Sequence, residues 1–171
     1  MKKLLVVLLV SVFTQTITAQ DLISASRSNN IEEINRLIEN GEDVNATDAR
    51  GFAPLTIAVY ANQREAVELL IEKGANINAS DRSGNTALMG AIFRGYPELA
   101  KLLIEKGADI NQVNANGASA LIFAATFGQN EIANYLLAKG ALTDSKDAQG
   151  KTAYDHAVLQ ENLELIEVLK K

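Results

Sequence analysis

The only histidine of the chain, His156, follows Asp155, and the two side chains could form an acid–base pair. General acid–base catalysis needs a proton acceptor held at hydrogen-bond distance from its target, in a site that other groups complete. The sequence has no second histidine and no cysteine to supply a thiolate nucleophile or a His/Cys zinc site. We therefore interpret His156 as a partly exposed helix residue, and we expect no enzymatic activity.

Three short segments that alternate Asp or Asn with an aliphatic residue could suggest calcium binding. They cover residues 43–45, 76–78 and 109–111, so they recur 33 residues apart. A calcium loop gathers its oxygen ligands within about 12 residues, whereas Asn and Asp commonly bond to the backbone of their own turn. We therefore expect these segments to form turns. The glycines match no phosphate-binding loop, and we expect no metal or other cofactor.

The glycines instead show that the chain repeats itself. One series spaced 33 residues apart is Gly41, Gly74, Gly107 and Gly140, and a second is Gly51, Gly84, Gly117 and Gly150. In register with them, residues 48–80, 81–113 and 114–146 form three full copies between a divergent first copy, 20–47, and a shortened last copy, 147–171. A period of this length is typical of proteins built from stacked units.

These copies resemble the ankyrin repeat, in which a β-turn precedes two helices. The residues that carry the resemblance are the Asp-x-x-Gly starts at Asp48, Asp81 and Asp147, with Thr86-Ala87-Leu88, Leu102-Leu103 and the Gly-Ala-Asp-Ile-Asn of 107–111. The resemblance covers essentially all of the chain after residue 19. It implies an all-α solenoid of stacked helix–turn–helix units with short β-turn or hairpin tips. No copy has the histidine of the family's Thr-Pro-Leu-His segment, so its hydrogen bonds are not expected.

Apolar spacing predicts the first helix of each copy independently of the family. Leu55, Ala58 and Val59 lie at i, i+3 and i+4, which places them on one face of a short helix. The small Ala58 recurs in every later copy and would let neighbouring helices approach closely. Helices this short persist only when they are stacked on one another.

A second helix is expected from about residue 64 to 73, with Val67, Leu70 and Ile71 pointing inward. A glutamate recurs near its start, where negative charge is favourable, and a glycine follows its end. At the two ends of the array, polar side chains replace the aliphatic ones of the inner copies; these are Glu33, Arg36 and Lys170. We expect the first and last copies to act as solvent-facing caps.

The resemblance also implies a binding surface, because ankyrin repeats commonly bind proteins through their tips and the exposed face of the first helix. Carried over by position, the tips supply Arg50, Phe52, Arg82, Asn85, Asn116 and Lys151, and the first helices supply Tyr60, Phe93, Arg94, Thr126 and Phe127. Exposed aromatic and Arg side chains are typical of interface centres. The alternative is that some of these aromatic side chains, Phe52, Tyr60, Phe93 and above all Phe127, pack between repeats. We expect a protein partner and a monomeric protein.

The first 19 residues have the pattern of a secretory signal peptide. Lys2 and Lys3 precede an apolar run from Leu4 to Phe13, and Ala19 is a small residue suited to cleavage. The run is about half as long as a membrane-spanning helix requires. We expect cleavage after Ala19 and a periplasmic or secreted protein that is not inserted in a membrane afterwards. An uncleaved anchor and a buried N-terminal helix are the alternatives.

Composition narrows the function further. The net charge is −5, and it becomes −7 once Lys2 and Lys3 are removed. Such a surface repels phosphate backbones and anionic headgroups, so nucleic acid is not an expected partner. The absence of cysteine with this leader favours a bacterial envelope. We expect a non-catalytic scaffold that binds, stabilises or regulates an envelope protein; the alternatives are a secreted effector acting on another cell and an enzyme on a helical scaffold.

Overall fold

The computed structural model describes residues 19–170, which form ten helices in five consecutive pairs. The first helices of the pairs are α2 (Ala19–Arg27), α4 (Pro54–Tyr60), α6 (Ala87–Arg94), α8 (Ala120–Thr126) and α10 (Ala153–Leu159). The second helices are α3 (Ile31–Glu39), α5 (Arg64–Glu72), α7 (Pro97–Glu105), α9 (Asn130–Ala138) and α11 (Leu163–Leu169). Residues 1–18 of the predicted signal peptide lie outside the described residues, and Ala19 is the first residue of α2.

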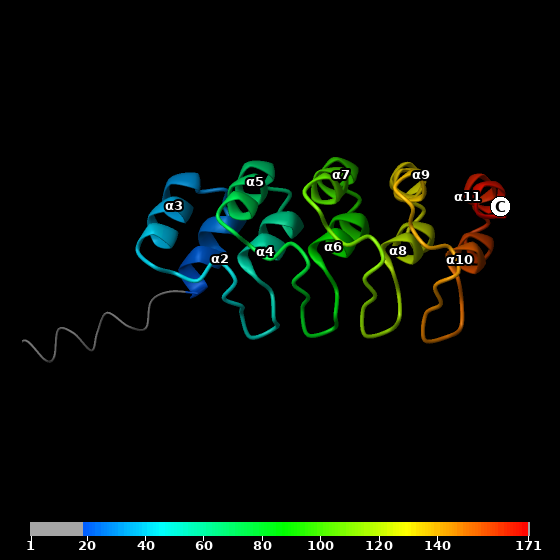
Figure 1. Cartoon of the computed structure of the whole chain (residues 1–171), viewed down its shortest axis with the longest axis horizontal. Coiled ribbons are helices and arrows are strands. Elements are labelled where there is room, and N and C mark those ends of the chain that lie inside the picture. Colours follow the sequence, from blue (N-terminus) through cyan, green and yellow to red (C-terminus); the bar gives the residue numbers. More distant parts are fainter. Residues whose placement is uncertain (1–18, 171) are drawn as a thin grey trace, which may run out of the picture.

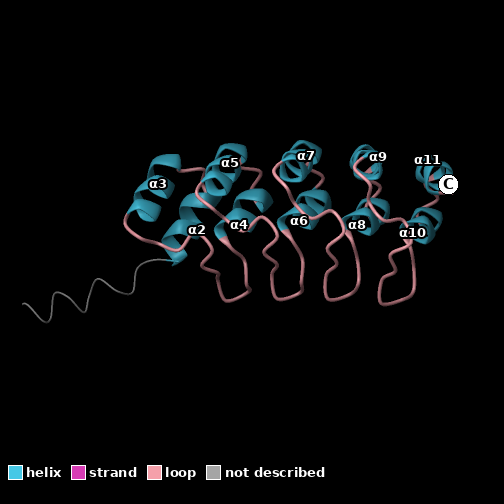
Figure 2. Ribbon diagram, in the orientation of Figure 1, coloured by secondary structure: helices cyan, strands magenta, loops and turns pink. Residues whose placement is uncertain are grey.

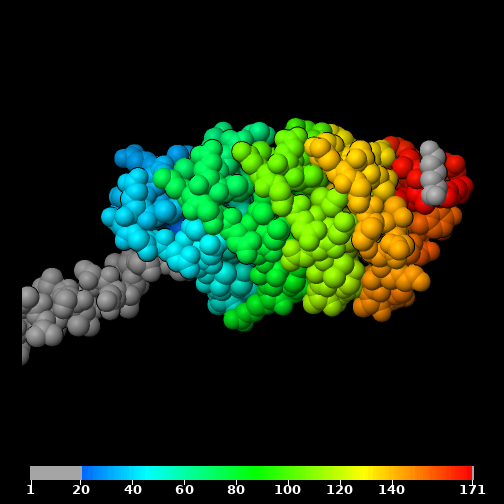
Figure 3. All heavy atoms as spheres, in the orientation of Figure 1, coloured from blue at the N-terminus to red at the C-terminus, as the bar shows by residue number. Residues whose placement is uncertain are grey.

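The pairs stack into an elongated all-α solenoid, which confirms the expected fold class. First helices contact first helices along one row, and the second helices lie along the other, with contacts between α3 and α5, between α7 and α9 and between α9 and α11 (Figure 1). The loops between pairs project as a row of tips on the side of the first helices that faces away from the second helices (Figure 2). In a space-filling view the repeats follow one another as adjacent bands of colour (Figure 3). No helix among the described residues is long and apolar enough to cross a membrane.

The core is aliphatic and follows the predicted helix faces. Leu55, Ala58 and Val59 are buried, as are Val67 and Leu70. The alanine of the first helix is buried in all five copies, fully at Ala58, Ala91, Ala124 and Ala157 and nearly so at Ala25, which allows the close approach of stacked helices. The second helix ends one residue earlier than expected, since Lys73 is its cap, and its Ile71 is only partly buried.

Side-chain caps replace the missing family histidine at most of the first helices. Thr86 and Ser119 each accept a hydrogen bond from the backbone N–H three residues on. Thr152 does the same in a capping box with Asp155, which occupies the place of that histidine. Only the start at Ala53 has no side-chain cap among these four helices, and there Pro54 supplies a residue whose fixed φ suits a helix start. The helix starts are therefore held locally without the histidine.

The segments that could have suggested calcium form turns, as expected, and also join the repeats. Asp43 Oδ1 accepts a hydrogen bond from the backbone N–H of Asn45 at 2.9 Å. The side chain of Asn45 in turn accepts a bond from the N–H of Asn76, in the next repeat, at 2.7 Å. Equivalent inter-repeat bonds run to Asn78 and Asn111. Among the described residues, no three His, Asp or Glu side chains are grouped as metal ligands would be.

A left-handed residue connects the two helices of each pair. This residue is Asn29, Asn62, Gly95, Gly128 and Glu161 in successive pairs, with φ between 53° and 70°. Glycine adopts this conformation freely and Asn tolerates it, but a residue with a longer side chain is strained there. Glu161 is therefore the one ill-suited residue of this series.

Replacing Glu161 by Gly is expected to raise the free energy of unfolding by about 0.5–1 kcal/mol. Relief of the left-handed strain would exceed the extra entropy that Gly gives the unfolded chain. Urea denaturation of the variant and of Glu161→Gln measures the effect. The Gln variant removes the charge but keeps Cβ, so an equal gain in both variants would assign the effect to charge and contradict the strain argument.

Candidate protein-binding surface

Each turn tip is shaped by one Asp or Asn side chain. Asp48 Oδ1 accepts hydrogen bonds from the backbone N–H groups of Arg50 and Phe52, at 2.8 and 3.0 Å. The same pair of bonds recurs at Asp81, Asn114 and Asp147 in the following tips. A fixed tip backbone holds the side chains that follow it in a fixed direction.

Hydrogen bonds between successive tips align them in a row. The backbone N–H of Arg82 donates to the carbonyl of Arg50 at 3.3 Å. The next two tips are joined in the same way, by bonds from Ala115 to Ser83 and from Ala148 to Asn116. Isolated antiparallel bridges at the bases of two tips complete the expected hairpin character. The tip residues Arg50, Arg82 and Asn116 thus lie along one continuous edge.

Arg50, Phe52 and Tyr60 come together in a hollow at the N-terminal end of this surface. We call it the N-terminal hollow; it has a volume of about 430 Å³, and its other lining residues are Arg27, Ile57 and Ala61. The rings of Phe52 and Tyr60 lie 5.6 Å apart. The guanidinium of Arg50 stacks over the Phe52 ring at 4.7 Å, a favourable cation–π geometry.

Tyr60 is half-buried. It therefore packs between repeats, which was the alternative to an exposed binding residue. Its ring lies against Gly90 in the middle of α6, where a Cβ would come within 3.0 Å of Tyr60 Cε2. Burial raises the pKa of the Tyr60 hydroxyl, with a further contribution from Asp81. Tyr60 therefore forms a wall of the N-terminal hollow and separates it from the next repeat.

A second concavity, the C-terminal hollow, gathers Asn116, Thr126 and Phe127. Its volume is about 340 Å³, and Phe123 and His156 also line it. Phe93 packs edge-on against Phe127 with ring centroids 5.1 Å apart, and Phe123 lies 5.9 Å from Phe127 on the other side. Phe93 and Phe127 nonetheless remain 50% and 43% exposed. These two rings form an exposed aromatic pair beside the hollow, and Phe127 is nearly as exposed as Phe93.

Phe123 and Ile57 line the two hollows although neither was among the residues predicted from the sequence. Both occupy the same position of the first helix, three residues before Thr126 and Tyr60 respectively. Because residues three and four apart share a helix face, the predicted exposure of Thr126 and Phe127 implies that Phe123 lies on the same face.

His156 is paired with Asp147 and not with its neighbour Asp155. Its Nε2 lies 2.7 Å from Asp147 Oδ2, and this contact ties helix α10 to its own tip. Backbone N–H groups of the tip, that of Lys151 first, and the His156 side chain hold the pKa of the Asp147 carboxyl below its ordinary value. The Asp155 side chain forms the capping box of α10 with Thr152. The contact between His156 and Asp147 therefore has a structural role, because it holds α10 against its own tip.

The remaining predicted residues do not join either hollow. Asn85 bonds to Asp81 and Asn114 and so holds two tips together. Arg94 donates a hydrogen bond to the Tyr96 hydroxyl at 3.2 Å. Lys151 lines a separate shallow depression near the C-terminal end, together with Tyr154 and Leu159. The predicted residues therefore lie on one face of the solenoid but in distinct groups along it.

Comparison with known proteins agrees with this architecture. A family model described as ankyrin repeats, in three copies, matches residues 22–114 and 109–171. A search of curated protein sequences found no significant match. The matched residues span nearly all of the helices described above. The chain therefore belongs to the ankyrin-repeat family.

Proposed function

We propose that this protein is a non-catalytic scaffold that binds a partner protein in the bacterial envelope through the face formed by its first helices and tips. The observation that carries the proposal is the exposed Phe93–Phe127 pair beside the C-terminal hollow. Large aromatic side chains that combine exposure with a neighbouring cavity are the usual anchors of protein interfaces. The family supports the broader function, because ankyrin repeats serve as scaffolds for protein–protein interaction.

The surface is also preorganised for binding. Its tips are held by Asp and Asn side chains and by bonds between neighbouring tips. The aromatic rings pack against one another, which limits their freedom before a partner arrives. Binding to a surface that is already ordered loses little conformational entropy. Most of the free energy gained from the contacts therefore contributes to the binding affinity.

A binding role fits the site chemistry better than catalysis does. Ankyrin-repeat proteins are typically non-catalytic, and the ankyrin family model matches nearly all of the described helices. The side chain of His156 is engaged with Asp147, whose other oxygen accepts two backbone bonds. A general base needs a free acceptor aimed at a substrate position. Both partners of this pair are instead used to hold the last repeat.

The envelope setting is supported by the N-terminal sequence. Lys2 and Lys3, the apolar run that follows them and the small Ala19 have the order of an exported leader. An envelope scaffold would accumulate in the periplasmic fraction of the source cells, with Gln20 as its first residue. Accumulation in the culture medium would favour the alternative, an effector that acts on another cell.

The double variant Phe93→Ala, Phe127→Ala is expected to reduce partner capture about tenfold or more. Loss of a central aromatic anchor commonly costs over 1 kcal/mol of binding free energy. Because both rings are about half exposed, the free energy of unfolding should change by about 1 kcal/mol at most. The measurement is quantitative mass spectrometry of proteins retained from envelope extract by immobilised residues 20–171, wild type against variant.

The matched control is Leu142→Ala, Leu163→Ala, which removes two exposed apolar side chains that line neither hollow. Capture should be unchanged in this control. If wild type and the Phe93, Phe127 variant retain the same proteins in equal amounts, the aromatic pair is not the binding site. If the control loses the partner as well, general surface hydrophobicity explains the capture.

A further inference from the structure

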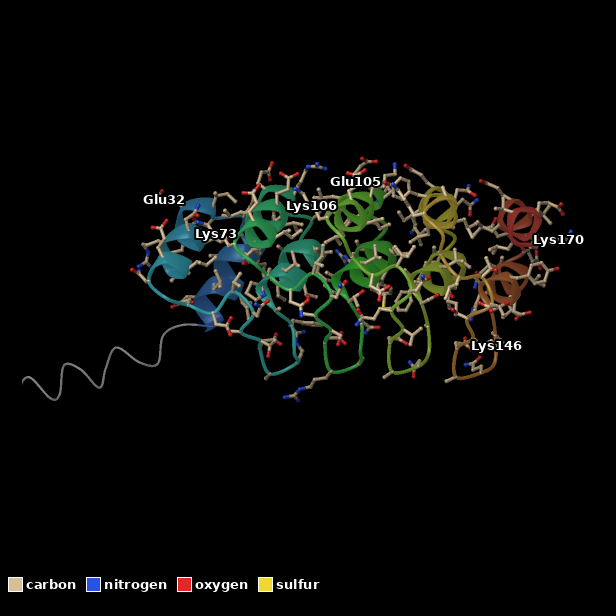
Figure 4. All side chains as sticks on the ribbon, viewed as in Figure 1. Glu32, Lys73, Glu105, Lys106, Lys146 and Lys170 are labelled. Atoms are coloured by element: carbon tan, nitrogen blue, oxygen red, sulfur yellow. The ribbon has the colours of Figure 1, made fainter. Side chains whose placement is uncertain are left out.

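The two rows of helices differ in charge. The second helices carry an excess of glutamate: Glu32, Glu33, Glu39, Glu65, Glu68, Glu72, Glu98, Glu105, Glu131, Glu164 and Glu167, against Arg36, Arg64 and Lys101. Glu32 and Glu105 lie on the side of the molecule opposite the tips (Figure 4). Lys73, Lys106, Lys139 and Lys170 cap four of these helices, so this row carries eleven glutamates against seven basic side chains and is net negative.

The face of first helices and tips is instead rich in arginine over its N-terminal half. Arg27 ends α2, Arg94 ends α6, and Arg50 and Arg82 lie on adjacent tips. Among the described residues, the only one of these arginines in a salt bridge is Arg50, which is 3.3 Å from Asp48. Carboxylates on the same helices and loops are Asp21, Glu42, Asp43, Asp48 and Asp81, and Asp81 accepts bonds from the N–H of Ser83 and from Asn85 within its own tip. Three of these four arginines, Arg27, Arg82 and Arg94, are therefore exposed and form no salt bridge among the described residues.

Two of these arginines line the N-terminal hollow itself. Arg27 and Arg50 flank the aromatic wall of Phe52 and Tyr60. The guanidinium fork binds carboxylates through two parallel hydrogen bonds, and it remains charged at any physiological pH. A hollow with apolar walls and arginines at its rim suits a peptide that presents both carboxylates and an apolar side chain.

We propose that the N-terminal hollow binds an acidic segment of the partner protein, with its carboxylates at Arg27, Arg50 and Arg82 and an apolar side chain against Phe52 and Tyr60. This inference rests on the proposed protein-binding function and adds the chemistry of the partner. Charge complementarity between the arginines and the acidic segment supports this assignment. It also orients the approach of the partner, because the glutamate-rich row of second helices repels the same segment.

Two other occupants are less well suited to this arrangement. A nucleic acid is a continuous polyanion, and the surrounding acidic surface would repel the length that extends beyond the arginines. A second copy of this chain could offer its glutamate-rich helices to the hollow. Two copies of the chain carry the same net negative charge of −5, however, so the rest of their surfaces opposes this approach. Both occupants give distinct results in the test below.

The test uses residues 20–171 as purified protein on an array of 12-residue peptides of random sequence. We expect the retained peptides to be enriched in Asp and Glu accompanied by an aromatic or large aliphatic residue. The double variant Arg27→Gln, Arg50→Gln should lose about tenfold in affinity for them, because two arginine–carboxylate pairs are removed. The variant Arg36→Gln, Arg64→Gln removes the same charge from second helices and should bind as wild type does.

Each other result overturns the inference in a distinguishable way. Retained peptides without acidic enrichment, if they depend on Phe93 and Phe127, would leave the proposed function intact and contradict only the acidic partner. Absence of any retained peptide would contradict both. Equal losses in the two arginine variants would show a nonspecific charge effect. Tighter binding of a single-stranded DNA oligomer, or a dimer in analytical ultracentrifugation that Arg27→Gln, Arg50→Gln dissolves, would assign the hollow to another occupant.

Discussion

Replacing Leu103 by Ala is expected to lower the free energy of unfolding by about 3–4 kcal/mol. Leu103 lies on α7 in the middle repeat, and none of its surface is exposed to solvent. Its removal loses the transfer free energy of the side chain and leaves a cavity, because α7 packs against α6 of its own repeat and α9 of the next and cannot collapse freely. Urea denaturation followed by circular dichroism measures the loss.

The control for this prediction is Leu169→Ala, at the same position of the last repeat. Leu169 is 9% exposed, and α11 packs against a neighbouring second helix on one side only among the described helices. The cavity there can be closed by movement of the terminal helix, so we expect a loss near the lower end of the usual range, about 2 kcal/mol. Equal losses at the two positions would contradict the stacking argument.

The fold could be predicted from the sequence because the residues that determine it recur at a fixed spacing. The positions of Leu55, Ala58 and Val59 recur with every repeat, and burial follows the same register. Stacked repeats contact mainly their neighbours, so a local pattern determines most of the structure. The glycines that end the second helices carry similar information, since Gly74, for example, has φ of 91°.

Contacts between repeats were harder to predict than contacts within them. The turn at Asp43 and Asn45 follows from residue type, but the bond from the N–H of Asn76 to Asn45 depends on how the next repeat is placed. The pairing of His156 with Asp147 depends likewise on the direction in which the last tip folds back. Sequence spacing specifies which residues share a face, and it does not specify side-chain directions across a turn.

The binding surface was predicted only in outline for the same reason. Register places Tyr60 and Phe93 at equivalent positions, yet Tyr60 lies half-buried against its neighbour and Phe93 is half exposed. The difference comes from the following repeat, because Gly90 leaves room for the Tyr60 ring and Phe123 occupies the equivalent place beside Phe93. The exposure of each such side chain thus depends on two neighbouring repeats, and it cannot be predicted from the sequence of one repeat alone.

Replacing Gly84 by Ala tests the joint between two tips and is expected to lower the free energy of unfolding by about 2–4 kcal/mol. Gly84 has φ of +78°, a conformation that costs a residue with Cβ about 1–2 kcal/mol. A Cβ at this position would also lie 2.7 Å from the backbone nitrogen of Ala115 in the next tip. That nitrogen donates the 2.9 Å bond to the Ser83 carbonyl, so the bond between the tips must break or move.

Gly150→Ala separates these two causes. Gly150 has nearly the same backbone conformation, with φ of +75°, but no described atom lies within 4 Å of the position of its Cβ. Its substitution should cost only the backbone strain, about 1–2 kcal/mol, so the difference between the two variants measures the contact between tips. Because that contact also aligns Arg82 with the tip that follows it, Gly84→Ala should weaken binding of acidic peptides, whereas Gly150→Ala should leave it unchanged. Identical losses of stability in the two variants would show that the tips are energetically independent.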